Sequence, residues 1–227
     1  MKRSQQNSSA YYYAIFLALF LIGFQTFGQT ENNFTNEVKG ITQKNDSLWD
    51  ASRETIVFTG SSSVRFWKSL QEDFPNRQIL NSGFGGSQAS DLLVFLDELV
   101  LTYNPAKVFI YEGDNDLWAK KRPNQVMTTM AQITQRIKAK NPSTQIVLIS
   151  AKPSISRWKM RGRFRRLNRK LERMAKTDPF IDYVDVWHPM LNSKKLKTDI
   201  FIEDGLHMNQ KGYDLWYEAM KDLVNNP

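Results

Sequence analysis

The feature that most constrains the fold is an alternation of short apolar runs with amphipathic stretches. Five runs rich in β-branched or aromatic residues predict buried strands: TIVFTG (55–60), QILNSG (78–83), KVFIYEG (107–113), TQIVLIS (144–150) and IDYVDVW (181–187). Strands that are apolar on both faces and separated by helices form parallel sheets covered on both sides. The chain is therefore predicted to be an α/β protein, a three-layer α/β/α sandwich with a central, mostly five-stranded parallel sheet.

The stretches between these runs have apolar residues at helical spacing. One lies over 63–74, and a second, with a Ser-Asp cap signal at its start, lies over 90–101. A third begins with Pro123, a residue suited to the first turn of a helix, and runs to Lys140. The last covers 209–224. Helices between successive strands are the connections that a parallel sheet requires.

The N-terminal residues have the composition of an export signal. Two basic residues are followed by an apolar run over 11–24 and then by small residues suited to cleavage before Gln29. The run is short for a membrane span of roughly 20 residues, so a cleaved signal peptide over 1–28 is favoured over an uncleaved membrane anchor. The mature protein is then expected to be periplasmic or secreted, with a polar N-terminal arm over 29–52 that contains at most a short helix, and one domain over 53–227.

The composition excludes several chemistries. The 227-residue chain has no cysteine, so it has no thiol nucleophile, no disulfide and no Cys-based metal site. Its two histidines argue against a His-rich zinc site, and we predict neither a metal nor an organic cofactor. Without disulfides the fold must be stabilised by core packing, which a hydrophobic content of 41% allows.

Four loops contain the groups that an ester hydrolase uses. They are GSSS, SGFGGS and EGDND after the first three predicted strands, and EDGLH before the last helix. Ligands of open parallel sheets bind beyond the carboxyl ends of the strands, where such loops gather. A serine at a strand-to-helix turn can attack an ester, a histidine can take its proton, and an aspartate can orient the histidine. Backbone N–H groups of a glycine loop and an asparagine amide can stabilise the oxyanion.

In order and spacing, these loops resemble the four sequence blocks of the SGNH hydrolase family, the GDSL-type esterases and lipases. FTGSSSVRFW resembles the first block and NSGFGGSQASDL the second, while YEGDNDLW and DGLH match the third and the last. The resemblance implies the flavodoxin-like SGNH hydrolase fold, a nucleophile at Ser62, and a base at His207 oriented by Asp204. It also implies an oxyanion hole formed by the backbone of Ser62 and Gly86 and by the side chain of Asn115.

One residue departs from the family pattern. The first block usually has Asp between its Gly and its Ser, where this chain has Ser61. Three adjacent serines leave the register open, and Ser62 is favoured because a nucleophile at the start of a helix suits this turn. Taken singly, Ser62 could instead cap a helix, Asn115 could cap a turn, and Gly86 could only mark a tight turn. Their joint occurrence favours the catalytic interpretation.

Other residues near these blocks are candidates for lesser roles. Phe84 and Trp118 each follow a block residue and could wall a pocket for an acyl or sugar group, although ordinary packing explains them almost as well. Arg157, after the fourth predicted strand, could reach the rim of the site. His188 follows the fifth predicted strand and precedes a proline, and a structural or surface role is favoured for it.

The positive charge of the chain is local. Residues 152–176 contain eleven lysines and arginines and one acid, Glu172, whereas the rest of the predicted mature chain is net negative. Apolar residues at helical spacing within 157–176 predict an amphipathic basic helix. Its charged side is either a solvated helix face or a surface for an anionic partner, such as lipid headgroups, a polysaccharide or an acidic substrate. Nucleic acid is not expected, because base-stacking motifs are missing.

The sequence therefore predicts an exported serine esterase that hydrolyses carboxylic esters. The resemblance implies esters of sugars, lipids or small alcohols, and short acyl groups are plausible for an exported member. Two alternatives stay open: a non-catalytic protein that binds an anionic polysaccharide or lipid surface through the basic helix, and an acyltransferase that uses the same residues. The sequence does not determine the acyl chain length, the alcohol portion of the substrate or the oligomeric state.

Overall fold

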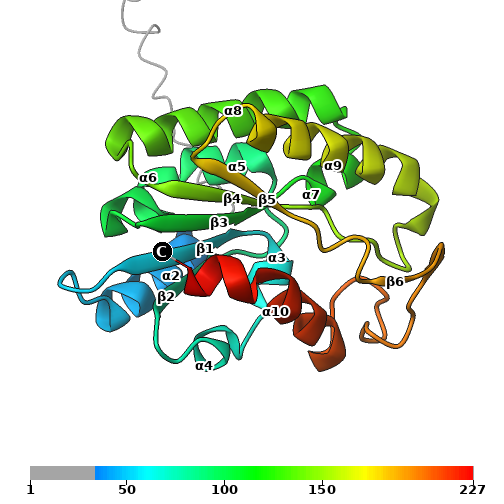
Figure 1. The fold of residues 1–227 in the computed structure, drawn as a ribbon, viewed down its shortest axis with the longest axis horizontal. Helices are drawn as coiled ribbons and strands as arrows, with labels where there is room; N and C mark the ends of the chain where they lie inside the picture. The colour runs from blue at the N-terminus through cyan, green and yellow to red at the C-terminus, as the bar shows by residue number, and fades with distance from the viewer. Residues whose placement is uncertain (1–33, 227) are drawn as a thin grey trace, which may run out of the picture. The chain divides into compact units, whose positions relative to one another are not determined.

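Five parallel strands form the central sheet of the protein, whose computed structural model describes residues 34–226 (Figure 1). The strands are β1 (Thr55–Gly60), β2 (Gln78–Gly83), β3 (Lys107–Tyr111), β4 (Gln145–Ile149) and β5 (Ile181–Val184). Their order across the sheet is β2-β1-β3-β4-β5, which is the order of flavodoxin-like folds. The predicted three-layer sandwich around a five-stranded parallel sheet is confirmed.

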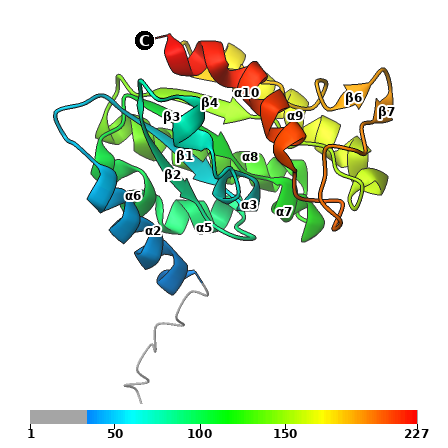
Figure 2. The same cartoon turned by 90° about the horizontal axis from the view of Figure 1, so that it is seen from below.

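Helices cover both faces of this sheet (Figures 1 and 2). One face is covered by α2 (Thr35–Leu48), α5 (Ala89–Val94), α6 (Leu96–Leu99), α8 (Pro123–Lys140) and α9 (Arg161–Lys176). The other face is covered by α3 (Ser62–Arg65), α4 (Leu70–Asp73) and α10 (Gln210–Asn225). The remaining elements are the 3-10 turns η1 (Leu101–Tyr103) and η2 (Trp158–Met160), the short helix α7 (Asp114–Trp118), and a hairpin of β6 (Leu191–Asn192) and β7 (Lys195–Leu196).

The side chains of β1 show how the core is divided between the two layers. Val57 belongs to the apolar cluster under α5, α8 and α9, while Ile56 and Phe58 belong to the cluster under α10. All three are almost completely buried, and the ring of Phe58 stacks on that of Phe109 at a centroid distance of 4.2 Å. Successive side chains of a strand point to opposite faces, so a wholly apolar strand must be covered on both.

Two predicted helices, over 63–74 and 90–101, are each broken into shorter segments. In the first, the side chain of Asn81 on β2 donates hydrogen bonds to the carbonyls of Val64 (2.9 Å) and Trp67 (3.4 Å). These bonds satisfy carbonyls at the end of α3, so the chain can turn there without exposing unpaired groups. The second stretch, 90–101, is fixed in a similar way: an arginine side chain of α8 donates a hydrogen bond to a backbone carbonyl of α5.

The N-terminal segment differs from its prediction. The sequence predicts a polar arm over 29–52 with at most a short helix, whereas the 14-residue helix α2 covers much of that range. Val38 packs in the core, and the buried Asn45 donates to the hydroxyl of Ser82 on β2 at 2.9 Å. The compact unit therefore begins at Phe34 rather than just before β1. The helix cannot be predicted from composition, because polar contacts help to hold it against the sheet.

The predicted signal peptide over 1–28 lies outside the described residues. Between residues 34 and 226, no helix is both long enough and apolar enough to cross a membrane. Export of the protein stays a prediction from the composition of its N-terminal residues.

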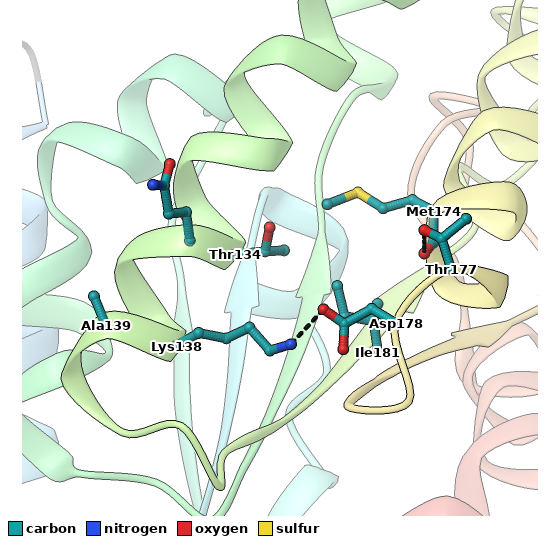
Figure 3. A pocket seen from close by; sticks show the side chains of 8 residues that line it. Thr134, Lys138, Ala139, Met174, Thr177, Asp178 and Ile181 are labelled. Atoms are coloured by element: carbon teal, nitrogen blue, oxygen red, sulfur yellow. Dashed lines mark hydrogen bonds and ion pairs between the residues drawn. The ribbon is translucent and has the colours of Figure 1, made fainter.

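A cavity of about 540 Å³ lies between the last turns of α8 and α9 (Figure 3). Lys138 and Asp178 form an ion pair beside it. Because Ile181, the first residue of β5, also lines it, this cavity lies at the amino edge of the sheet. Ligands of such folds bind at the opposite, carboxyl edge. The functional site is therefore expected at the carboxyl edge.

Candidate active site

The first strand ends in a turn that requires glycine. Gly60 has a φ of +129°, and a Cβ added to it would lie 2.0 Å from the carbonyl oxygen of Tyr111 on β3. The close approach lets the backbone N–H of Ser61 donate to the same carbonyl at 3.1 Å. The next residue, Ser62, begins α3 at the carboxyl edge of the sheet and is half-buried.

Ser62 lies beside a histidine from the far end of the chain. Its hydroxyl oxygen and Nε2 of His207 are 2.9 Å apart, and Nδ1 of the same ring is 2.5 Å from Oδ2 of Asp204. The three side chains form one hydrogen-bonded line from carboxylate to hydroxyl. In that geometry an imidazole can remove the proton of a serine. The side chain of His207 is 20% exposed, so a ligand can approach this line from solvent.

The loop before α10 fixes Asp204 beside the imidazole. One carboxylate oxygen accepts hydrogen bonds from the backbone N–H groups of Leu206 (2.8 Å) and His207 (2.9 Å). Burial opposes ionisation of this carboxyl, but these bonds and the imidazole outweigh burial and hold the pKa of Asp204 below its usual value. The carboxylate is therefore ionised at neutral pH and keeps Nδ1–H of the ring directed toward itself.

A buried lysine that belongs to none of the four sequence blocks supports the same loop. Nζ of Lys152 donates to the carbonyl of Leu206 at 2.5 Å, and the residue is 1% exposed. Burial lowers the pKa of Lys152 to about 8. The bond ties the chain after β4 to the loop that carries His207. The sequence signal is a lysine three residues after the end of β4, in a place where a parallel strand leads to a functional loop.

The three adjacent serines have different surroundings. Ser61 is buried, and its hydroxyl donates to Asp114 at 3.4 Å. Ser63 is buried as well, and its carbonyl accepts a hydrogen bond from the hydroxyl of Tyr213 at 3.0 Å. Of the three, Ser62 is the one whose hydroxyl meets the imidazole. The register favoured from the sequence agrees with this geometry.

The glycine of the second block lies in an open turn. Gly86 is exposed, has a φ of +77°, and has no atom within 4 Å of the position that a Cβ would take. Among the described residues, none accepts a hydrogen bond from the backbone N–H of Gly86 or of Ser62. Both N–H groups are therefore available to a ligand.

The N-terminal helix holds this turn in place. Glu37 of α2 accepts a hydrogen bond from the backbone N–H of Gly85 at 2.8 Å and pairs with Arg65 of α3 at 3.1 Å. Helix α2 thus connects the glycine turn to the helix that begins with Ser62. Glu37 lies in the segment predicted to be a polar arm, and no motif marks it.

Asn115 is held at both ends of its amide. Nδ2 donates to the carbonyl of Ser87 at 2.9 Å, and Oδ1 accepts from Nη2 of Arg157 at 2.9 Å. Because a guanidinium can only donate, the bond to Arg157 requires that Oδ1 and not Nδ2 faces it. The second N–H of the Asn115 amide remains for a ligand.

Arg157 is buried instead of lying at the rim of the site. Its place after the fourth strand predicts a substrate contact, but it is 8% exposed and its guanidinium pairs with Asp114 at 3.1 Å. The indole of Trp118 lies over the guanidinium, 5.4 Å from ring centre to guanidinium carbon. Arg157 therefore acts on the site through Asn115. Asp114 also accepts from Ser61, so a carboxylate lies beside the position where the family pattern has Asp.

The two aromatic candidates for substrate contact differ. Phe84 is fully buried, and its ring packs edge-on against those of Phe34 and Phe95. Its prediction as a substrate contact is wrong, because the residue after β2 turns into the core. Trp118 is 58% exposed beside Arg157 and stays a candidate.

The second histidine also has a carboxylate partner. Asp185 stands three residues before His188, at the spacing that Asp204 has to His207, and the two side chains are paired. The spacing alone therefore does not distinguish the two histidines. The side chain of His188 is 77% exposed and lies at the surface, as predicted. In the described part of the chain, no serine hydroxyl is hydrogen-bonded to it.

A buried carboxyl lies behind the carbonyl that holds Asn115. Glu112 is 1% exposed, and one of its oxygens accepts from the hydroxyl of Ser87 at 2.7 Å. The other oxygen has no hydrogen-bond partner within the described residues. Burial raises the pKa of Glu112 well above its usual value, the bond from Ser87 offsets this in part, and nearby carboxylates add to the rise.

We expect Glu112→Gln to stabilise the fold at neutral pH. A raised pKa means that the folded protein binds this proton more tightly than the unfolded chain does. Stability therefore falls as the pH rises from the unfolded value, about 4.5, toward the folded one. Glutamine has nearly the same side-chain shape and does not ionise, so the variant does not lose this stability as the pH rises. The loss avoided is about 1.4 kcal/mol of unfolding free energy for each unit of pKa shift.

Thermal unfolding between pH 4 and pH 8 measures this effect. The Tm advantage of Glu112→Gln should grow with pH, while the control Glu72→Gln, at an exposed acid of α4, should show no such growth. An advantage that is constant or shrinks toward pH 8 would contradict a neutral Glu112 in the folded protein.

A family model matches most of this chain. Residues 46–215 match the GDSL-like Lipase/Acylhydrolase family. The chain belongs to this family. The resemblance to SGNH, or GDSL-type, hydrolases that its four loops indicate is confirmed, and membership of this family supports an ester hydrolase.

Solved structures share the fold of this hydrolase. A GDSL-like lipase from Bacteroides thetaiotaomicron VPI-5482 is similar with a TM-score of 0.70 at 21% identity, over 82% of this chain and 96% of that one. A catalytic mutant of an acetylxylan esterase from Geobacillus stearothermophilus is similar with a TM-score of 0.65 at 18% identity, over 77% and 95%. At these identities the likeness establishes the fold.

A curated relative is longer than this chain. The N-acylneuraminate cytidylyltransferase of Escherichia coli O18:K1:H7 (strain RS218 / NMEC) is 23% identical over 197 residues. The match covers 85% of this chain but 44% of the relative. Because the chain spans less than half of that protein, the activity in the relative's name is not carried over to this hydrolase.

Proposed function

We propose that this hydrolase is a serine esterase in which Ser62 is the nucleophile, His207 the base and Asp204 the carboxylate that orients the base. The observation that carries the proposal is the unbroken line of hydrogen bonds, 2.9 Å from Ser62 to His207 and 2.5 Å from His207 to Asp204. The ionised Asp204 stabilises the imidazolium that forms when the base takes a proton.

The reaction has two similar halves. The Ser62 oxygen attacks the ester carbonyl carbon while Nε2 of His207 takes the hydroxyl proton. The imidazolium then gives this proton to the leaving alcohol as the ester C–O bond breaks, which leaves an acyl-enzyme. A water molecule, deprotonated by the same nitrogen, attacks the acyl-enzyme carbonyl. The acid leaves, and the proton returns to Ser62.

Three donors are proposed to stabilise the oxyanion of each tetrahedral intermediate. They are the backbone N–H groups of Ser62 and Gly86 and the second N–H of the Asn115 amide. Each such donor lowers the barrier by roughly 3 kcal/mol. The guanidinium of Arg157 on Oδ1 supports this role, because a positive charge there fixes the amide and polarises its N–H bonds.

Short acyl esters of sugars, lipids or small alcohols are the proposed substrates. The ring of Phe66 lies 4.9 Å from the imidazole of His207, and Trp118 and Ile155 are exposed near the site. These side chains offer a small apolar surface suited to a short acyl group. One structural neighbour is an acetylxylan esterase, which makes acetyl esters of sugars a natural first choice. We also propose export, on the composition of residues 1–28.

Aryl esters of graded acyl length test the proposal. We expect the protein to hydrolyse 4-nitrophenyl acetate and butyrate with a higher kcat/KM than the corresponding long-chain esters. A fluorophosphonate should inactivate it and leave one adduct that peptide mass spectrometry assigns to Ser62. An inert protein with no adduct would refute the serine mechanism, and an adduct on Ser61 or Ser63 would refute the assigned nucleophile.

A further inference from the structure

A row of arginines follows one side of α9. Arg161, Arg165, Arg169 and Arg173 stand four residues apart, so their starting points are spaced by about 6 Å along the helix axis. All four are exposed, and no carboxylate in the described part of the chain forms an ion pair with any of them. The positive charge of this row is therefore available to a partner.

Two adjoining cavities make the first three arginines of this row one side of a groove. A cavity of about 510 Å³ lies between the first turns of α9 and the β6–β7 hairpin; it is lined by three cationic side chains, among them Arg165 and Lys194, and by no acid. A second cavity of about 450 Å³ continues past Arg169. Both cavities are lined by Arg165, Trp187 and His188, so they form one continuous groove.

The acids near this groove are already paired. Glu172 and Asp185 line the second cavity, but Glu172 pairs with Lys176 at 2.6 Å and Asp185 pairs with His188. Neither forms an ion pair with the arginine row. The groove therefore favours a ligand that carries negative charge.

The groove begins at the edge of the sheet that carries Ser62. Trp158, at its near end, directly follows Arg157, whose guanidinium holds Asn115. The rings of Trp158 and Trp187 stack at a centroid distance of 6.2 Å, and both line the groove. Figures 1 and 2 show the hairpin beside the start of α9, from which the helix runs back along the sheet. A polymer in the groove would therefore have one end near the ester site.

We propose that this groove binds a linear acidic polysaccharide and that the enzyme removes acyl groups from such a polymer. The proposal rests on the proposed function, because it names the substrate class of the Ser62 site. Carboxylates spaced along a sugar chain suit a row of guanidinium groups, since each guanidinium binds a carboxylate as a planar fork. The polymer then holds successive ester groups near Ser62.

Other anionic partners fit the groove less well. A protein that docks on lipid inserts apolar side chains, but the exposed large hydrophobic residues in the described range do not line either cavity: Leu48, Phe66, Val94, Trp118, Ile155, Phe180 and Ile202. A single nucleic acid strand needs exposed aromatic faces for its bases. Here Trp187 is 4% exposed, and the guanidinium of Arg161 lies over the ring of Trp158 at 5.5 Å.

The test compares two double variants that lose the same charge. Arg165→Gln with Arg169→Gln removes the centre of the row, and Lys39→Gln with Arg53→Gln removes two exposed cations elsewhere. The first measurement is the Kd for polygalacturonate, a polymer with one carboxylate per sugar, at 50 and 300 mM NaCl. The second is kcat/KM for O-acetylated polygalacturonate divided by kcat/KM for 4-nitrophenyl acetate.

We expect the wild type to bind polygalacturonate, with an affinity that falls as salt rises. The arginine variant should bind about tenfold more weakly and show a specificity ratio about tenfold lower, while the control stays within twofold of wild type. Equal losses in both variants, or no preference for polygalacturonate over neutral xylan, would overturn the proposal. So would equally tight, arginine-dependent binding of anionic phospholipid vesicles or of oligothymidylate. Arginine-dependent binding without hydrolysis of any ester would support the groove and refute the proposed function.

Discussion

Replacing Ser62 with alanine is expected to lower kcat for 4-nitrophenyl acetate by about 10⁴- to 10⁶-fold. Alanine removes the oxygen that attacks the ester, so no acyl-enzyme can form, and the oxyanion donors alone leave a small residual rate. The fold should be unchanged, because the Ser62 side chain is half-buried and, within residues 34–226, its hydroxyl is hydrogen-bonded only to the imidazole of His207. Steady-state kinetics and thermal unfolding measure the two quantities.

The neighbouring serines supply matched controls for this variant. Ser61→Ala loses a long hydrogen bond of 3.4 Å to Asp114, and Ser63→Ala alters a buried site away from the imidazole. Both should keep kcat within about tenfold of wild type. Ser62→Ala combined with His207→Ala should lose no more than Ser62→Ala alone, because the two groups act as one unit. Substantial activity in Ser62→Ala, or loss only in Ser63→Ala, would contradict the assignment.

The sheet is predictable because its signal is local. Each strand is a run of apolar, mainly β-branched or aromatic residues that must be covered on both faces, and β1 and β2 have the predicted bounds. Helix α8 is equally clear, since Pro123 marks its first turn and its apolar stripe is regular. The order of the strands is not contained in these local patterns; it is implied only by the resemblance, through the flavodoxin-like fold.

The helices that differ from prediction depend on distant side chains. The stretch 63–74 turns where Asn81, on the next strand, donates to its carbonyls. Helix α2 is polar along much of its length, and Asn45 is buried only because Ser82 accepts its hydrogen bond. Neither partner is marked by periodicity, so composition and pattern cannot reveal these contacts.

The same division holds in the site. Ser62, Asn115 and His207 can be predicted, because the four loops resemble the sequence blocks of the family in order and spacing. The residues that support them cannot be predicted in this way. Glu37 lies in a polar helix, and Lys152 follows a strand whose sequence indicates only burial. The sequence predicts that Arg157 lies near the site, but it does not predict where the side chain points. That direction depends on Asn115 and Asp114, which lie more than 40 residues earlier in the chain.

Replacing Arg157 with alanine is expected to lower kcat by about 10²- to 10³-fold, close to the loss of one oxyanion donor. Without the guanidinium, only the bond from Nδ2 to the carbonyl of Ser87 still orients the Asn115 amide, and the 4% exposed carboxylate of Asp114 loses its ion pair. KM for a small ester should change far less than kcat, because Arg157 is buried beneath Trp118 and positions the amide instead of touching substrate.

A lysine cannot replace this guanidinium. Arg157→Lys supplies one charge but no planar fork, so it can reach either Asp114 or Asn115 with good geometry but not both. We expect it to recover Tm more than kcat. Guanidinium ion added to Arg157→Ala should restore part of kcat by entering the vacated site, whereas it should not raise kcat of the wild type. Circular dichroism and thermal unfolding establish that the variants compared are folded.

A double-mutant cycle separates positioning from general destabilisation. If Arg157 acts through Asn115, then Asn115→Ala already removes what Arg157 contributes to the barrier. The combined variant should therefore have the kcat of Asn115→Ala within a few-fold, although each single variant is strongly impaired. Losses in kcat that multiply would show that Arg157 acts by another route, through direct contact with substrate or through the packing of the loop. Non-additivity combined with rescue by guanidinium ion is an outcome that a purely structural role would not produce, because an unfolded or loosened loop has no defined site for the ion.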